Sequence, residues 1–297
     1  MTGGVRAAPH ARTPSPRKDS MRMTQPLTET IVARLRAAGA VARAQDLYEG
    51  AGADFYERLV GGDPVEIREV LALARTTGDP ILDLAAGSGR LTIPLVRSGR
   101  RVTALDSSSD MLSRLRRALP DHPLLDGVVA DMRSFALGRV FPLIVLGATS
   151  ITLLDRAGRA RLYAAVQGHL APGGVFALTV AGGASATELS SPQDREITVP
   201  GPDGAQTYLF SQQIEDGGFT RLVNWVRVAD VVPHAEVTVL TSRLRLLDAH
   251  QLARELVDAG FATPAITAVR AHPGVDILLL ATTWPDAPRR GGPDVRG

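Results

Sequence analysis

The chain contains no cysteine and no long hydrophobic run, and each absence excludes a class of protein. Without cysteine there is no disulfide, no thiolate nucleophile and no zinc–cysteine centre. The longest apolar runs, such as Ile277 to Ala281, are far shorter than the roughly 20 residues that a membrane-spanning helix needs. We therefore expect a cytoplasmic protein that does not enter a membrane.

Lysine is almost absent as well, because Lys18 is the only one in 297 residues and nearly every cation is an arginine. The net charge is only +2, and no run of arginines has the spacing of a nucleic-acid contact. We interpret the arginine excess as the codon bias of a GC-rich genome. The composition predicts no nucleic-acid partner and is compatible with a homodimer.

The two ends of the chain differ in composition from the rest. Residues 1–26 are rich in arginine, proline, serine and threonine and lack the apolar region of a secretory signal. We expect a disordered arm there, or sequence upstream of a start at Met21 or Met23, and a disordered tail at 286–297. Between the arm and the next domain, residues 27–79 are expected to form a helical lid, with helices over 28–44 and 64–75.

Residues 80–180 alternate between short apolar runs and amphipathic segments. Strands are predicted over 81–85, 101–105, 127–130, 141–147 and 175–180, and helices over 91–98, 110–119 and 156–170. Strict alternation of this kind indicates right-handed crossovers and an α/β fold, with a parallel sheet covered by helices on both faces.

Residues 181–243 break this rhythm. Stretches such as "QTYLFSQQIED" and "TRLVNWVRVADVV" alternate apolar and polar side chains, with "GPDG" and "EDGG" as turns between them. We predict an inserted antiparallel sheet without helices. The α/β pattern returns over 244–285, with a helix at 249–259 and strands at 263–269 and 275–283.

The glycine turn "LDLAAGSGR", residues 82–90, follows the first of these strands. In an open parallel sheet, ligands bind beyond the carboxyl ends of the strands. The turn is not a triphosphate-binding loop, because Arg90 and Leu91 stand where that loop needs lysine and serine or threonine. It also departs from the dinucleotide fingerprint, because Thr92 occupies the place of the third glycine.

Three carboxylates mark the ends of three successive strands. Asp83 lies inside a strand, where a carboxylate is costly unless a cation or a hydrogen-bond donor meets it. Asp106 ends the next strand, about 17 residues after Gly89, where it could accept both hydroxyls of a ribose. Asp131 ends the third strand, and with Met132 it could contact the edge and face of an adenine.

On these motifs, residues 45–285 resemble the class I S-adenosylmethionine-dependent methyltransferases. The turn is similar to the family's first motif, with Ala85 in place of the usual first glycine, and "LAPGG" before the fifth strand is a further similarity. The resemblance implies a Rossmann-like doubly wound sheet with an antiparallel last strand, here carrying the inserted antiparallel sheet. It also implies S-adenosylmethionine as the cofactor.

The same resemblance assigns residues to the cofactor. Asp83 would meet the ammonium of the methionine moiety, Asp106 the ribose, and Asp131 the adenine. Arg90 is either a contact to the cofactor carboxylate or a solvated arginine at a helix start. The full set is Tyr48, Asp83, Ala85, Gly87, Gly89, Arg90, Asp106, Ser107, Met111, Asp131, Met132, Gly147 and Ser150.

The acceptor of the methyl group would lie under the lid and the inserted sheet. The candidates for it are Tyr56, Tyr208, Phe210, Arg221 and Trp225, with packing in a core as the alternative for the aromatic ones. No Ser/His/Asp set or carboxylate pair has convincing spacing, so a hydrolase is excluded and no catalytic residue or metal ligand is named. An amine acceptor needs no strong base, which favours N-methylation.

A narrower resemblance concerns "VLGATSITLLD" and "LDAHQLARELVDAGF", which are similar to methyltransferases of daptide-type ribosomal-peptide biosynthesis. It implies a natural product as substrate, a peptide or a small molecule with an amine. Three alternatives stay open at this point: an O-methyltransferase of a small metabolite, an NAD(P)-dependent Rossmann oxidoreductase, and a catalytically silent binding module. The intact Asp83, Asp106 and Asp131 argue against the last.

Overall fold

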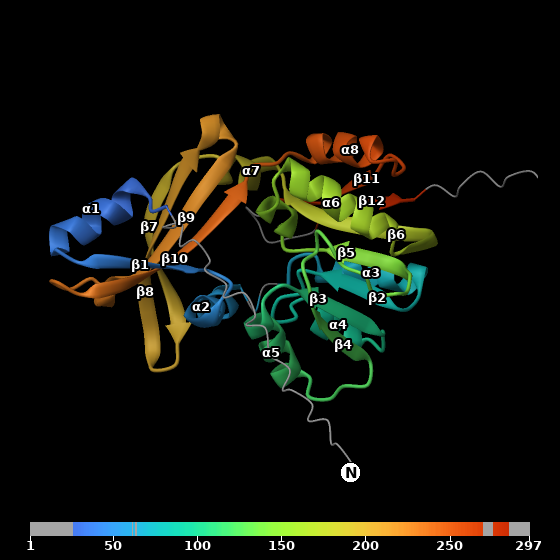
Figure 1. Ribbon diagram of the computed structural model, residues 1–297, viewed down its shortest axis with the longest axis horizontal. Helices are drawn as coiled ribbons and strands as arrows, with labels where there is room; N and C mark the ends of the chain where they lie inside the picture. Colours follow the sequence, from blue (N-terminus) through green and yellow to red (C-terminus); the bar gives the residue numbers. More distant parts are fainter. Residues whose placement is uncertain (1–25, 61, 63, 270–275, 285–297) are drawn as a thin grey trace, which may run out of the picture.

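A computed structural model describes residues 26–60, 62, 64–269 and 276–284. The described chain contains two sheets that stand side by side, one of seven strands and one of five (Figure 1). Within these ranges no helix is long and apolar enough to cross a lipid bilayer. Most of the expected arm and the whole expected tail lie outside the described residues.

The seven-stranded sheet has the order β11-β12-β6-β5-β2-β3-β4. Its strands are β2 (Ile81–Leu84), β3 (Val102–Asp106), β4 (Leu125–Val129), β5 (Phe141–Leu146), β6 (Leu170–Ala181), β11 (Ala265–Val269) and β12 (Ile277–Thr283). Strands β2 to β6 pair in parallel, whereas β12 runs antiparallel to both β6 and β11. This confirms the predicted doubly wound sheet with an antiparallel last strand.

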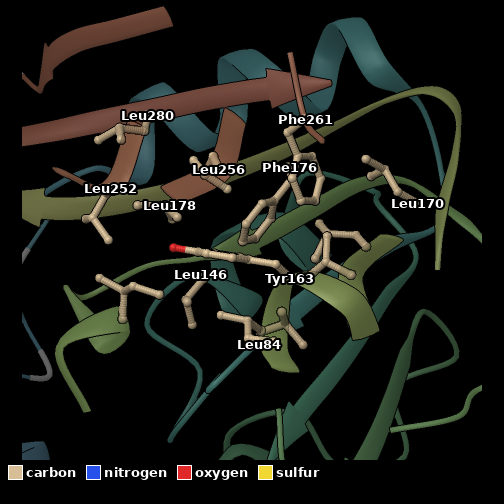
Figure 2. Packing of buried hydrophobic residues seen from close by; sticks show 14 of the residues in the cluster. Leu84, Leu146, Tyr163, Leu170, Phe176, Leu178, Leu252, Leu256, Phe261 and Leu280 are labelled. Atoms are coloured by element: carbon tan, nitrogen blue, oxygen red, sulfur yellow. The ribbon is translucent and has the colours of Figure 1, made fainter. Parts of the chain in front are cut away.

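Helices cover both faces of this sheet, because its central strands are apolar on both sides. They are α3 (Ile67–Thr77), α4 (Thr92–Arg97) and α5 (Ser109–Ala118) on one face, and α6 (Arg156–Gln167) and α8 (Ala249–Asp258) on the other. Figure 2 shows the second of these interfaces, where Phe176 of β6 packs 5.9 Å from Phe261, and Tyr163 of α6 meets the same ring edge-on.

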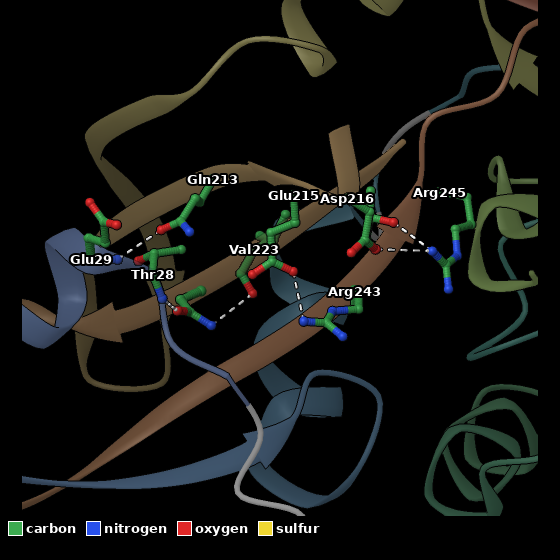
Figure 3. Close-up of polar contacts among 10 residues, drawn as sticks. Thr28, Glu29, Gln213, Glu215, Asp216, Val223, Arg243 and Arg245 are labelled. Atoms are coloured by element: carbon green, nitrogen blue, oxygen red, sulfur yellow. Dashed lines mark hydrogen bonds and ion pairs between the residues drawn. The ribbon is translucent and has the colours of Figure 1, made fainter. Parts of the chain in front are cut away.

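The five-stranded sheet has the order β1-β10-β9-β8-β7. Its strands are β1 (Val41–Asp46), β7 (Gln193–Gly201), β8 (Gly204–Glu215), β9 (Thr220–Arg227) and β10 (Glu236–Arg245). Helix α1 (Glu29–Ala38) packs on one face, through Ile31 and Leu35. Thr28 starts α1 and its backbone N–H donates to the Asn224 side chain of β9, 2.7 Å away (Figure 3).

Helix α2 (Gly50–Val60) packs on the other face of this sheet and joins it to the seven-stranded sheet. Phe55 inserts between two aromatic side chains of the sheet, Tyr208 and Trp225, with ring centroids 4.4 and 5.0 Å away. On its outer side α2 docks on α5, where Arg114 forms ion pairs with Asp54 and Glu57. Helix α2 thus lies between the five-stranded sheet and α5, which covers the seven-stranded sheet.

Two sequence predictions in the N-terminal segment are wrong. The helix expected over 28–44 ends at Gly39, which adopts a left-handed conformation with φ of 62°, and residues 41–46 form β1 instead. Strand β1 pairs in parallel with β10, almost 200 residues later in the chain, and such pairing overrides local helix propensity. Helix α2 itself was not expected, because its sequence begins with the unfavourable "GAGA".

Residues 181–243 form most of the five-stranded sheet, but they are not free of helix as predicted. A short helix, α7 (Gly183–Leu189), and two 3-10 turns, η2 (Asp216–Gly218) and η3 (Val228–Asp230), lie among the strands. The backbone N–H of Ala184 donates to the carboxylate of Asp276 at 2.8 Å, and this contact from outside the segment fixes the start of α7. The period-2 pattern of the flanking strands gives no sign of it.

Replacing Phe55 by alanine should destabilise the protein by about 3–5 kcal/mol, because it opens a cavity in a well-packed aromatic cluster. Phe55 is only 1% exposed. Urea unfolding followed by the fluorescence of Trp225 and Trp284 measures the change.

The matched control is Phe219→Ala in the same domain, because Phe219 is 70% exposed. Its expected effect is within about 0.5 kcal/mol. Equal unfolding midpoints for the two variants would contradict the packing role of Phe55.

Candidate active site

The loop after β2 has the unusual backbone that its glycines allow. Ala85, Gly87 and Gly89 all have positive φ, of 51°, 57° and 103°. A Cβ on Gly89 would lie 2.4 Å from Leu115 of α5, so only glycine permits this packing. A Cβ on Gly87 would meet nothing within 4 Å, so the backbone there borders open space.

Asp106, at the end of β3, ties this loop to the next one. One oxygen of its carboxylate accepts the backbone N–H of Gly87 at 2.8 Å, and the other accepts that of Ser108 at 2.8 Å. Burial raises the pKa of Asp106, although these backbone hydrogen bonds lower it in part. Each carboxylate oxygen retains a further lone pair, so the group can still accept hydrogen bonds from a ligand.

Asp83 lies in β2, close to Asp106, and is almost fully buried at 2% exposure. Its carboxylate accepts a hydrogen bond from the Thr92 hydroxyl at 2.6 Å. Burial raises the pKa of Asp83 to about 7, and the negative charges of Glu66 and Asp106 add to the shift, while Thr92 and Arg90 oppose it. A carboxylate in this position is stabilised by a cationic partner.

Arg90 is paired with Glu66, a residue that the sequence analysis did not identify. Its guanidinium pairs with the Glu66 carboxylate and donates to the backbone O of Val65 at 2.8 Å. Glu66 is buried and also accepts the backbone N–H of Ala148, 2.6 Å away, in the loop after β5. The sequence places Glu66 in an ordinary helical pattern, and only its left-handed φ of 63° turns it inward.

Gly147, in the loop after β5, lies in close contact with the Glu66 side chain. A Cβ at Gly147 would lie 2.7 Å from the Glu66 carboxylate and 2.4 Å from the Leu91 side chain. Ser150 follows at the start of a 3-10 turn, η1 (Ser150–Leu153), and donates its N–H to the Gly147 carbonyl. The loops after β2 and β5 thus meet at Glu66.

The third predicted carboxylate, Asp131, is engaged locally. The Arg133 guanidinium donates to both of its oxygens, and this pairing lowers the pKa of Asp131. Met132 is half-buried against the core beside α6. The predicted adenine contacts of Asp131 and Met132 stay predictions.

Around α5, the predicted adenosine neighbours differ in exposure. Met111 is buried, whereas Ser107 is exposed. Ser108 caps the helix by accepting the N–H of Met111, and its hydroxyl donates to the backbone O of Tyr48 at 2.8 Å. This second bond fixes the lid to the end of β3.

The two lid tyrosines lie against each other. Tyr48, between β1 and α2, and Tyr56, within α2, meet edge to face with ring centroids 5.1 Å apart. Burial is the main cause that raises the pKa of Tyr48 far above its usual value, and the charge of Arg221 opposes the shift. The Tyr48 phenol is therefore protonated at neutral pH.

Three of the aromatic residues predicted to line an acceptor site, Tyr208, Phe210 and Trp225, lie in a packed cluster, and their contact with an acceptor stays a prediction. Phe210 stacks on Trp225 at 4.7 Å, and both lie with Tyr208 in the core under Phe55. Arg221 differs from them, because it lies near the start of β9 and interacts electrostatically with Tyr48 and Tyr56. Within the described ranges, no group of three or more acidic or histidine side chains is arranged to hold a metal ion.

Comparisons with known proteins identify the family. Residues 81–174 match the family model for a methyltransferase domain. A solved structure of the glycopeptide N-methyltransferase MtfA with S-adenosyl-L-homocysteine is 33% identical, covers 87% of this chain and 99% of that chain, and has a TM-score of 0.59. The chain belongs to the S-adenosylmethionine-dependent methyltransferases.

Two curated relatives from Streptomyces act on amino sugars attached to a nucleotide. The dTDP-3-amino-3,6-dideoxy-alpha-D-glucopyranose N,N-dimethyltransferase of S. fradiae is 35% identical over 46% of this chain and 52% of its own length. The dTDP-3-amino-3,4,6-trideoxy-alpha-D-glucopyranose N,N-dimethyltransferase of S. venezuelae is 28% identical over 62% of this chain and 73% of its own length. The chain thus spans about half the length of the first relative.

The residues at the ends of β2 and β3 fit S-adenosylmethionine. Asp83 is a buried carboxylate that a ligand ammonium would stabilise, and Asp106 retains acceptor capacity for a ribose diol. Gly87 leaves open space beside the loop between them. These three residues are the ones that we expect to hold the cofactor.

The affinity for S-adenosylmethionine should fall with pH below about 7, by about tenfold for each pH unit, because Asp83 must release its proton to meet the ammonium.

The stability of the free protein should change with pH in the opposite direction. The folded-state pKa of Asp83 lies above the unfolded value, so stability decreases as pH rises from about 4 to about 7. Calorimetric titration and urea unfolding across this range measure the two effects.

Asp83→Asn should flatten both pH profiles while keeping the hydrogen bond from Thr92. Asp248→Asn is the control, because Asp248 caps α8 and asparagine is an equally good cap. An affinity profile of Asp83→Asn that still falls below pH 7 would exclude Asp83 as the titrating group.

Proposed function

We propose that the protein transfers a methyl group from S-adenosylmethionine to an amine of a natural-product intermediate. The observation that carries the proposal is the 33% identity to the glycopeptide N-methyltransferase MtfA over 99% of that chain. The two curated relatives also methylate nitrogen. Transfer to nitrogen is thus common to the three relatives, although they act on different molecules.

The chemistry of the lid supports nitrogen as the acceptor. A hydroxyl acceptor needs a general base, whereas an amine needs only to be neutral when it attacks. The Tyr48 phenol is protonated at neutral pH and so cannot accept a proton. Asp83 and Asp106 have proposed roles toward the cofactor, and the Asp46 carboxylate, whose pKa is raised by burial, accepts the backbone N–H of Tyr48 at 2.7 Å.

When bound, S-adenosylmethionine supplies an activated methyl group on its sulfonium sulfur. The Asp106 carboxylate would hold the ribose, and Asp83 the ammonium, which fixes the cofactor at the ends of β2 and β3. Tyr48 and Tyr56 would exclude water above it, because the Ser108 hydroxyl anchors their segment to the same loop. Proximity and orientation supply most of the acceleration in such a reaction.

The acceptor is proposed to be a small molecule or a peptide. The similarity of "VLGATSITLLD" to enzymes of the daptide type favours a peptide amine, and the curated relatives favour an amino sugar. The stretch "VLGATSITLLD" contains η1, the turn that contacts β10 of the five-stranded sheet. Acceptor selection would therefore depend on that sheet, and cofactor binding on the other.

Calorimetric titration with S-adenosylmethionine, S-adenosylhomocysteine and NADPH tests the cofactor first. Binding of the two adenosyl ligands without NADPH is expected. Transfer is then measured by mass spectrometry on pairs of peptides and sugars that carry either an amine or a hydroxyl at the same position. Methylation of the amines supports the proposal, methylation of the hydroxyls alone overturns it, and binding of NADPH alone overturns the whole assignment.

Asp106→Ala should weaken the binding of S-adenosylmethionine at least about tenfold, because it removes two charge-assisted hydrogen bonds that shape the loop together with the acceptor for the ribose. Isothermal titration calorimetry measures the dissociation constant.

Asp126→Ala is the control for this variant, because the Asp126 carboxylate is exposed and pairs with Arg139 at the edge of the same sheet. Its affinity should equal that of the parent. If Asp106→Ala also binds as the parent does, the ribose assignment is wrong.

A further inference from the structure

Arg221 lies on the face of the five-stranded sheet that turns toward α2. It pairs across the sheet with Leu244 of β10 and Ile214 of β8, and Leu244 belongs to the same buried cluster as Phe55. Alternation along β9 puts Val223 and Trp225 on this face too. Arg221 is therefore a cation at the edge of an apolar cluster, and burial lowers its pKa.

No acidic side chain among the described residues pairs with Arg221, in contrast to the neighbouring arginines. Arg243 forms an ion pair with Glu215 at 2.7 Å, and Arg245 pairs with Asp216 at 3.4 Å (Figure 3). Alternation puts Glu215 on the opposite face of the sheet from Arg221. The acids that follow β8, Glu215 and Asp216, therefore pair with Arg243 and Arg245 and not with Arg221.

Arg221 is nevertheless held in a defined position. Its guanidinium donates to the side-chain oxygen of Gln212 on β8 at 2.7 Å. Gln212 is itself buried, and its amide donates to the backbone O of Leu189 and of Ser191, at the end of α7. A charged side chain that is oriented by a fixed partner, but not neutralised, is suited to bind an anion.

The position of Arg221 places this cation beside the proposed methyl-transfer site. Its charge acts on both lid tyrosines, Tyr48 and Tyr56, and Tyr48 in turn interacts with Asp106. Strand β10, which pairs with β9 at Arg221, contacts η1 after the loop that contains Gly147. The end of β10 points toward the seven-stranded sheet in Figure 1.

We propose that Arg221, oriented by Gln212, binds an oxyanion of the methyl acceptor, so that the substrate is an amine that also carries a carboxylate or a phosphate. The inference rests on the proposed N-methylation. It deepens that function, because it adds to the amine a second group that the protein recognises. Arg221 acts on binding and not on the transferred methyl, so it is a specificity-determining residue.

The physical reason is the cost of a half-buried charge without a counter-ion. Removing a guanidinium from water weakens its hydration, and among the described residues a single neutral amide, that of Gln212, accepts a hydrogen bond from it. An oxyanion of the substrate would restore the missing charge and accept two parallel N–H groups. A neutral substrate would leave the penalty in place.

The test uses inorganic phosphate and acetate as probes, on the full chain saturated with S-adenosylhomocysteine. Thermal unfolding is followed while each anion replaces chloride at constant ionic strength. The wild type should gain thermal stability with increasing phosphate or acetate, and Arg221→Met should need at least about tenfold more of the anion for half of the effect. Response to phosphate alone or to acetate alone identifies which oxyanion the site prefers.

Two further variants keep the result interpretable. Arg243→Met removes a paired arginine from the opposite face and should respond to the anions as the wild type does. Arg221→Lys keeps the charge and should keep part of the response.

Two outcomes overturn the proposal. One is an equal response of wild type and Arg221→Met to both anions, and the other is the absence of any response in the wild type. A normal affinity of Arg221→Met for S-adenosylmethionine is expected, and a loss there would assign Arg221 to the cofactor instead. Failure of the proposed N-methylation is recognised separately, as absence of transfer to amines in the wild type.

Discussion

The Asp106 carboxylate is the point on which the arrangement of the site depends. Through Gly87 it fixes the loop after β2, and through Ser108 it fixes the start of α5. The Ser108 hydroxyl then reaches the backbone of Tyr48, so the lid is attached to the same strand end. One side chain at the end of β3 thus links the cofactor loop, a helix cap and the connection to the second sheet.

Around Asp106, the acidic side chains that the structure describes outnumber the cations. Asp83, Asp106 and Glu66 lie close together, and Arg90 is the cation that faces them. Because Arg90 is engaged by Glu66 and by the Val65 carbonyl, it compensates Asp83 only in part. Burial is the main cause of the raised pKa of Asp83, and the negative charges of Glu66 and Asp106 add to it. This excess of negative charge suits a cofactor that carries positive charge on nitrogen and on sulfur.

Under the proposed function, the two sheets divide recognition between them. The seven-stranded sheet presents carboxylates at the ends of its parallel strands, where a cationic cofactor can be met by several loops at once. The five-stranded sheet presents an aromatic core and one uncompensated arginine, Arg221, toward the lid. Helix α2 contacts the five-stranded sheet through Phe55, and it contacts α5, a helix that covers the seven-stranded sheet, through the acids that pair with Arg114. A change of acceptor would therefore require changes in the second sheet and the lid, while the cofactor site stays the same.

The sequence by itself determined the seven-stranded sheet and the carboxylates Asp83 and Asp106, because both depend on local patterns: buried strands, helical periodicity, and the positions where strands end. It did not determine β1, α2 or the inward turn of Glu66. Strand β1 forms by pairing with a strand almost 200 residues away, and α2 is stabilised by aromatic side chains of the same distant sheet. The sequence named Arg221 but could not show that no acid in the described part of the chain pairs with it, because pairing across strands depends on register and on which face each side chain occupies. Those are properties of the tertiary structure alone.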